Sequence, residues 1–584
     1  MPTAFVPETL DATDFTHLEP LIRALLDRPL MAAGDVEAWL LDRSDLYAAI
    51  SEGRARLYIA MTCNTEDEGA QQAYARYIED VAPKLTPLFF ELDRKLVEAA
   101  NTTGLNMPRY AVLLRNAKAD VDLFRPENVL LETQLAQLAQ RYDQVAGAMT
   151  VEFDGREQTL PQMARYQEMT DRAVRERAWR ASAARRLRDR DTIDAIYDEM
   201  VALRDRVAKN AGYADYVGYA FTSKHRFDYD VAACVRFHDG VADAIVPLVR
   251  ALEDERRRSL GVERLCPWDL SVDVKGRPPL RPFEGGADLI RKGRVVMHRL
   301  DHRLAGLFEQ LGDGTGRVQS AADVGRVMLD LDSRKGKAPG GYQYNLDRLR
   351  KPFIFMNAAG MHRDVETLVH EAGHAFHSML CADEPLSEYR ESPTEFAEVA
   401  SMSMELLTMR HWGPSGDGRE GFYPNEEDFR RACRDQLKHS VLLLPWIATI
   451  DAFQHWVYTH PGHTRAARTA QWLAIDDRFG SSVSWAGLED VRASLWHRQM
   501  HLFDHPLYYI EYGIAQLGAL QLWLHALEAG EASAVERYMR ALRLGGSRPL
   551  PALFEAAGLT FDFGPETVRR LADRVRAELA KIPE

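Results

Sequence analysis

His370-Glu371-Ala372-Gly373-His374 is a complete H-E-x-x-H motif within a strongly helical stretch. Residues four apart lie on one face of a helix, so the two imidazoles can grip a single Zn²⁺. Glu371 stands beside that pair, where its carboxylate can take a proton from a metal-bound water. The alternative is an ordinary solvated helix face. We expect a zinc-binding helix that begins near Asp364, with Gly373 leaving room for a second backbone close to the metal.

A catalytic zinc needs a third protein ligand and one open position. Another histidine six residues after His374 would indicate a metzincin, but position 380 is leucine. A downstream glutamate is the other common solution, and the segment 391–405 supplies four of them, Glu391, Glu395, Glu398 and Glu405.

The helical register chooses among these glutamates. Ser392, Pro393 and Glu395 fit the N-cap, first and third positions of a capping box, so we expect a helix to start there and Glu395 to be structural. Glu398 lies one turn further between apolar neighbours, and it is the predicted third ligand. Glu405 is two turns beyond Glu398, about 10 Å away and too far for the same ion, but it could orient a ligand histidine.

A second concentration of polar rings follows near the C-terminus, in the segment 501–513. It contains His501, His505, Tyr508, Tyr509 and Tyr512, and the spacing places the last three on one helix face. Neutral phenols and imidazoles can donate to the oxyanion of a tetrahedral intermediate. The alternative is the edge of an aromatic core.

Length and periodicity predict a helical protein of more than one domain. A chain of 584 residues is too long to fold around one compact core. Most of it has helical spacing, and we place a soft boundary between an N-terminal helical region, 1–195, and a catalytic region, 196–584. The expected long helices are 19–30, 71–100, 126–148, 168–209 and 231–260.

Strand signals are few. An Asp-Gly turn predicts a hairpin over 149–160, and the apolar run 351–357 predicts a short strand just before the zinc helix. That strand could pair with an extended peptide as an exposed edge does. The glycine-rich segment 332–344 is either a surface turn or a flap whose tyrosines contact substrate. It lacks the order of a phosphate-binding loop, so we exclude nucleotide binding.

Composition excludes several classes of protein. The net charge of −14 leaves no basic surplus for nucleic acid. Five scattered cysteines do not form a disulfide framework, and they contain no C-x-x-C pair. The longest apolar stretch, 441–450, is too short for a membrane span, and no secretory signal is evident at the start. We therefore expect a cytoplasmic protein without membrane or nucleic-acid partners. The sequence leaves its oligomeric state open.

These motifs together resemble the thimet oligopeptidase and oligoendopeptidase F family of zinc metallopeptidases, over roughly residues 320–525. The resemblance lies in the segments His370–His377, Glu398–Glu405, Asp451–Tyr458 with Pro461–His463, and Pro506–Gln516.

The resemblance implies one Zn²⁺ per chain, held by His370, His374 and Glu398, with Glu371 as general base. Tyrosines matching Tyr508 and Tyr512 would stabilise the transition state, with His501 or His505 assisting. It also implies a mainly α fold, zincin-like, with two helical lobes around a deep channel and a small β-sheet beside the zinc helix. The channel would admit short peptides and exclude folded proteins.

The expected function is therefore a zinc-dependent oligoendopeptidase that hydrolyses internal bonds of short peptides. Two alternatives stay open. The first is a peptidyl dipeptidase or carboxypeptidase on the same scaffold, which needs a cationic group to hold the substrate C-terminus. The second is a non-catalytic peptide-binding protein with structural zinc, although such a site gains nothing from Glu371.

Overall fold

The computed structural model describes residues 5–416 and 418–583, and it confirms a mainly helical fold with small sheets. The chain divides into two compact units. Unit 1 consists of residues 1–122, 280–436 and 518–561, and unit 2 consists of residues 123–279, 437–517 and 562–584. The channel expected between two lobes stays a prediction, as does the boundary near residue 195.

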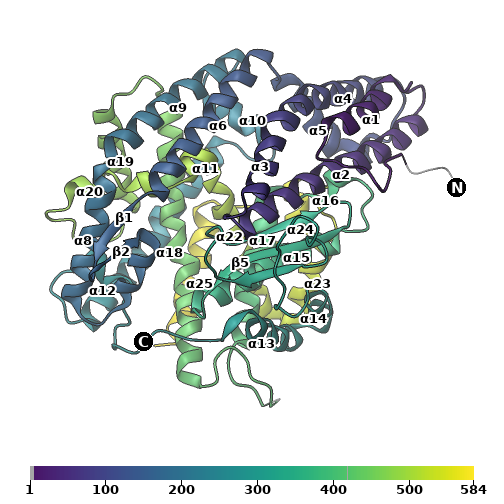
Figure 1. Ribbon diagram of the computed structural model, residues 1–584. Helices are drawn as coiled ribbons and strands as arrows, with labels where there is room; N and C mark the ends of the chain where they lie inside the picture. The colour runs from purple at the N-terminus through teal and green to yellow at the C-terminus, as the bar shows by residue number, and fades with distance from the viewer. Residues whose placement is uncertain (1–4, 417, 584) are drawn as a thin grey trace. The chain divides into compact units, whose positions relative to one another are not determined.

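Unit 1 carries the predicted zinc helix and a three-stranded sheet (Figure 1). Its N-terminal helices are α1 (Phe15–Asp27), α2 (Ala33–Cys63), α3 (Glu68–Arg76), the π-helix η1 (Tyr77–Val81), α4 (Ala82–Thr102) and α5 (Met107–Leu123). The later elements are α13 (Gly285–Leu300), α14 (His302–Glu309), β3 (Leu329–Asp332), β4 (Tyr342–Leu346), β5 (Lys351–Ala358), α15 (His362–Leu380), α16 (Ser387–Arg390), α17 (Thr394–Thr408), η5 (Met409–His411), α23 (Glu531–Leu542) and α24 (Leu550–Ala556).

The strand order in this sheet is β3-β5-β4, with β3 parallel and β4 antiparallel to β5. The strand predicted over 351–357 exists as β5, but the expectation that it presents an exposed edge is wrong because it is the central strand. Its run from Pro352 to Met356 is buried throughout, which suits a strand covered on both faces and paired on both sides. The edge strand is β4, which lies within the segment predicted as a turn or flap.

β4 is held in place by its tyrosines. Tyr342 stacks on Phe355 of β5 with ring centroids 4.8 Å apart, and its hydroxyl lies 2.6 Å from the Thr62 hydroxyl on α2. Tyr344 packs against Tyr58 of the same helix. Tyr342 is therefore anchored to the sheet and to α2, which makes it a structural residue of the strand.

Unit 2 is almost entirely helical. Its elements are α6 (Pro126–Gly147), β1 (Thr150–Phe153), β2 (Arg156–Thr159), α7 (Leu160–Met163), η2 (Ala164–Glu168), α8 (Arg172–Arg188), α9 (Arg190–Asn210), α10 (Tyr216–Ser223), α11 (Val231–Gly240), η3 (Val241–Ile245), α12 (Val246–Ser259), η4 (Pro267–Asp269), α19 (Arg465–Phe479), α20 (Glu489–Ala493), η6 (Leu495–Arg498), α21 (His501–Asp504) and α25 (Pro565–Leu579). Two long helices, α18 (Glu426–Thr459) and α22 (Tyr509–Ala529), contribute residues to both units.

Two sequence expectations for unit 2 have clear outcomes. The predicted hairpin is present as β1 and β2, and its turn residues Asp154 and Gly155 both have positive φ, as a type I′ turn requires. The helix expected over 168–209 is instead two helices, because Asp189 leaves the helical region with φ −97° and ψ 7°. Within residues 5–416 and 418–583, no helix combines the length and the apolar character needed to cross a bilayer.

Candidate active site

Helix α15, which carries the two predicted histidine ligands, starts two residues before the position expected from the sequence. Asp364 sits in its first turn, and its carboxylate accepts hydrogen bonds from the backbone N–H groups of Met361 (2.9 Å) and Ala359 (2.7 Å). An acidic side chain in this position satisfies donors that would otherwise stay unpaired and favours the positive end of the helix dipole. This cap fixes the register that places His370 and His374 on one face.

The three predicted ligands lie together in unit 1. One ligand atom each from His370, His374 and Glu398 falls within 4.8 Å of the other two. Glu398 Oε2 is 3.4 Å from His370 Nε2 and 3.7 Å from His374 Nε2. A tetrahedral Zn²⁺ with nitrogen and oxygen bonds of usual length separates its ligand atoms by about 3.3 Å. The donor set and its spacing therefore fit zinc with one position left open.

A second layer of contacts orients these ligands. His370 Nδ1 lies 2.7 Å from Glu405 Oε1, the contact expected for a carboxylate behind a ligand histidine. Gln436 donates to the other oxygen of Glu405 at 2.9 Å. The hydroxyl of Ser401 donates to Glu398 Oε2 at 3.0 Å. Each ligand side chain held in this way needs little reorganisation to bind a cation.

Gly373 permits the close approach of α15 and α17. A Cβ at this position would lie 2.6 Å from the Ala400 carbonyl oxygen and 2.6 Å from Ser401 Cα, both backbone atoms of α17. The expectation of a second backbone close to Gly373 is confirmed. The residue explains how Glu398, two positions before Ala400, reaches the two histidines.

The electrostatic surroundings shift the pKa values of the three predicted ligands in different directions. Burial alone would raise the pKa of Glu398, but His374 and His370 outweigh burial and lower that pKa to about 2. Burial lowers the pKa of His374 to about 4, and the attraction of Glu398 only partly opposes this shift. For His370, contact with Glu398 and Glu405 outweighs burial and raises the pKa well above its usual value. The centre thus presents an ionised carboxylate and a neutral imidazole at His374.

Glu371 lies beside the ligands and is buried. Burial raises its pKa to about 7, with His370 opposing the rise and Glu398 adding to it. The Gln343 backbone of β4 hydrogen-bonds this carboxylate, and a Cβ on Gly341 would lie 4.0 Å from its Oε1. The carboxylate therefore faces the edge strand.

The capping box predicted for α17 is wrong. The N-cap is Pro393, which has no side-chain acceptor, and α17 begins at Thr394. The Ser392 hydroxyl instead donates to the Pro393 carbonyl oxygen at 3.2 Å. Glu395 is buried rather than solvated at a helix end, and Glu391 lies before the helix and is exposed.

The predicted histidines and tyrosines of the segment 501–513 cluster within unit 2. The rings of Tyr508 and Tyr512 are 5.1 Å apart, and His505 lies 6.1 Å from Tyr508. His501 contacts both tyrosines, at 5.7 and 6.1 Å. Tyr508 precedes α22 rather than lying within it, and the positive φ of Leu507 turns the chain there. Their catalytic roles stay predictions.

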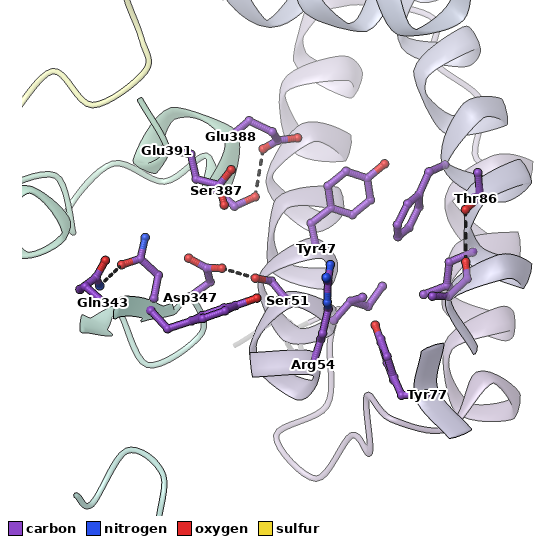
Figure 2. A pocket seen from close by; sticks show the side chains of 16 residues that line it. Tyr47, Ser51, Arg54, Tyr77, Thr86, Gln343, Asp347, Ser387, Glu388 and Glu391 are labelled. Atoms are coloured by element: carbon purple, nitrogen blue, oxygen red, sulfur yellow. Dashed lines mark hydrogen bonds between the residues drawn. The ribbon is translucent and has the colours of Figure 1, made fainter. Parts of the chain in front are cut away.

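The sequence did not reveal a cavity of about 630 Å³ within unit 1 (Figure 2). One wall carries aromatic residues of α2, η1 and α4, including Tyr47, Tyr77 and Phe89. The other includes three consecutive residues of β4, 343–345, and Asp347. Successive strand side chains point to opposite faces, so a cavity that touches all three runs along the strand's edge. Gln343, which lines the cavity, also hydrogen-bonds Glu371 through its backbone, so this residue links the cavity to the candidate catalytic carboxylate.

The chain matches the sequence models of two protein families. The description "Peptidase family M3" matches residues 165–276 and 317–571, and "Peptidase M3 N-terminal domain" matches residues 5–124. Together these ranges cover most of both units.

Individual proteins give the same picture. An "Oligoendopeptidase F homolog" of Mycoplasma pneumoniae is 24% identical over 352 residues, which are 56% of this chain and 52% of that protein. The chain thus spans about half the length of the curated relatives it matches. The solved structure "PZ peptidase A with inhibitor 2" aligns with a TM-score of 0.86 and 27% identity over 99% of both chains. Oligoendopeptidase-F from Enterococcus faecium shares the fold, with a TM-score of 0.64, 15% identity and 97% of each chain covered.

Proposed function

The chain belongs to peptidase family M3, and we propose that it is a zinc-dependent endopeptidase that hydrolyses internal bonds of short peptides. The observation that carries the proposal is the convergence of His370, His374 and Glu398, with Glu371 beside them. A purely structural site would have no use for the carboxylate of Glu371.

His370, His374 and Glu398 would hold the ion, and Glu405 would keep the His370 ring oriented. When bound there, zinc supplies a Lewis acid that polarises the peptide carbonyl and makes water a better nucleophile near neutral pH. Glu371 takes the proton of the attacking water and passes it to the leaving amine. Its hydrogen bond from β4 holds the carboxylate in the direction of the substrate.

The substrate would lie along β4. This strand pairs with β5 on one side only, so its other edge has backbone donors and acceptors for an extended peptide. The cavity of Figure 2 follows the same edge away from Glu371 and offers aromatic surface to substrate side chains. Strand pairing supplies affinity independent of sequence, and the cavity supplies a preference for side chains that fill it.

For transition-state stabilisation we assign Tyr512 and Tyr508 as donors to the oxyanion, with His505 or His501 assisting. Support comes from the ring cluster in unit 2, where the side chains of two tyrosines and two histidines contact one another. Neutral donors suit an oxyanion because they need no deprotonation to act.

The deciding experiment combines a substitution with product analysis. Glu371→Gln keeps the size of the side chain but removes the proton acceptor, so hydrolysis should fall by several orders of magnitude, about 10⁴-fold, with zinc retained. Glu366→Gln is the matched control, because it makes the same change five residues earlier on α15 and should leave turnover close to normal. Near-normal turnover of Glu371→Gln refutes the assignment.

Products from blocked and free-ended peptides of graded length identify the mode of cleavage. An endopeptidase cuts a peptide blocked at both ends at internal bonds. Release of dipeptides or single residues that requires a free C-terminus would instead establish the peptidyl dipeptidase or carboxypeptidase alternative.

The cavity assignment has its own test. Thr86 is an exposed residue of α4 that lines the cavity, so Thr86→Trp should raise KM for peptides long enough to reach it, with kcat preserved. Thr102→Trp is the matched control, since Thr102 is also exposed on α4 and bonds its own helix backbone but does not line the cavity. Equal KM values for both variants would show that substrate does not bind in the cavity.

A further inference from the structure

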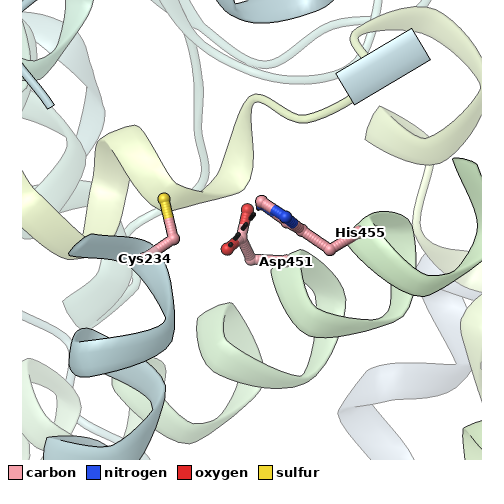
Figure 3. Close-up of side chains that lie close together, drawn as sticks. All are labelled: Cys234, Asp451 and His455. Atoms are coloured by element: carbon pink, nitrogen blue, oxygen red, sulfur yellow. Dashed lines mark ion pairs between the residues drawn. The ribbon is translucent and has the colours of Figure 1, made fainter. Parts of the chain in front are cut away.

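Unit 2 contains a second group of potential metal ligands, which the proposed reaction does not use. Cys234 of α11 and Asp451 and His455 of α18 each offer one ligand atom, and these atoms lie within 4.8 Å of one another. Figure 3 shows the thiol and the imidazole on either side of the carboxylate. Cys234 and Asp451 are fully buried, with 0% exposure, and the side chain of His455 is 12% exposed.

Two polar atoms in this group lack hydrogen-bond partners among the described residues. They are Asp451 Oδ1 and His455 Nε2, and both are shielded from solvent. A buried polar atom without a partner costs roughly 1–3 kcal/mol, so such atoms require an explanation. A bound cation would satisfy both, because a carboxylate oxygen and an imidazole nitrogen are each metal ligands.

The spacing in the group fits ligands of a single ion. One ligand atom from each of Cys234, Asp451 and His455 lies within 4.8 Å of the other two, as in the group His370, His374 and Glu398 of the candidate active site. Ligand atoms around a tetrahedral zinc are about 3.3 Å apart, or about 3.6 Å where one is sulfur.

The surroundings supply an orienting contact as well. His238 Nε2 lies 2.8 Å from Asp451 Oδ2 and is buried with it. Ligating carboxylates are usually held by such a second hydrogen bond, which leaves the other oxygen directed at the ion.

We propose that Cys234, Asp451 and His455 form a second zinc site, with the fourth coordination position left open. The thiolate, imidazole and carboxylate set selects Zn²⁺ or a similar borderline-soft divalent ion over Mg²⁺ and Ca²⁺. The ion joins α11 to α18. Phe237, one turn after Cys234, packs against Gly513 so closely that a Cβ there would lie 2.7 Å from the ring. The site thus also fixes the start of α22, where Tyr512 lies.

Cobalt titration of the full chain tests the proposal separately from catalysis. The candidate active site has no sulfur ligand, so a thiolate-to-cobalt charge-transfer band in the near ultraviolet reports a cysteine site alone. We expect the metal-free protein to take up two Co²⁺ per chain, with this band saturating at one equivalent. Cys234→Ser should bind one Co²⁺ and lose the band.

The controls separate the two sites. Cys433→Ser changes a different buried cysteine, which lies on α18 and belongs to no ligand group in the described part of the chain, and it should keep the band. His370→Ala should lose one Co²⁺ but keep the band. If Cys234→Ser does not fold, His455→Gln serves instead. This variant should bind Co²⁺ at the cysteine site, as measured by the band, at least about 100-fold more weakly. A wild type without the band, or a band that survives in Cys234→Ser, overturns the proposal whatever the hydrolytic activity is.

Discussion

Replacing Gly373 with alanine tests whether the contact between α15 and α17 sets the metal centre. The new Cβ would lie 2.6 Å from two backbone atoms of α17, whereas ordinary contact begins at 3.4 Å. The two helices must therefore separate by about 0.8 Å at this point, since neither backbone can rotate away as a side chain would. Glu398 lies two residues from the clash and must move with α17.

The expected cost follows from these distances. Overpacking of this kind costs about 1–3 kcal/mol, which exceeds the gain of about 1 kcal/mol that alanine brings to a helix. A misplacement near 1 Å in a catalytic constellation lowers the rate about 10²-fold. Gly373→Ala should therefore lower the melting temperature, weaken zinc binding and reduce kcat/KM by about two orders of magnitude.

Zinc affinity is measured by competition with a chromogenic chelator, and kcat/KM with an internally quenched peptide. Gly306→Ala is the matched control, because Gly306 lies within α14 of the same unit and a Cβ there meets no atom within 4 Å. It should be neutral or stabilising by up to about 1 kcal/mol. Unchanged zinc affinity and kcat/KM in Gly373→Ala would refute the coupling between helix spacing and the metal centre.

Three further experiments probe the site. Glu405→Ala should weaken zinc binding about 10- to 100-fold while the metal-saturated enzyme stays active, and chelator competition measures it. Glu398→Ala should abolish zinc binding, whereas Glu391→Ala should keep it; metal analysis of both variants checks the choice of ligand, and loss of metal in the second would contradict it. Tyr→Phe at the true oxyanion donor, Tyr512 or Tyr508, should lower kcat about 10²- to 10³-fold with little change in KM. Full activity in both phenylalanine variants would remove the tyrosines from the mechanism.

The helix that carries His370 and His374 could be predicted because the two histidines are four residues apart, so a single helical register sets the position of both. Helical periodicity also predicted that Glu405 could orient a ligand histidine, and its hydrogen bond to His370 is present. The edge strand β4 escaped prediction because its glycine-rich approach has the composition of a loop. Its strand character depends on Thr62 and Phe355, which are far away in the sequence.

Other features depend wholly on tertiary contacts. Cys234 and Asp451 are separated by more than two hundred residues, so no spacing motif could join them. The capping box failed because Pro393 took the N-cap position, one residue later than the serine that pattern favours. A short polar pattern at the start of a helix tolerates a shift of one residue. The spacing of His370 and His374 within a long helix does not.

The free edge of β4 also affects how the protein aggregates when it is heated. An unpaired strand edge is a template for another chain, and proteins commonly cover such edges with helices. Here the aromatic side chains of α2, η1 and α4 stand opposite the edge and bound a cavity only about 630 Å³ in size. Local unfolding of these N-terminal helices would uncover β4 while its pairing with β5 persists. Irreversible aggregation should then begin at this strand, at temperatures below those that melt the helical core.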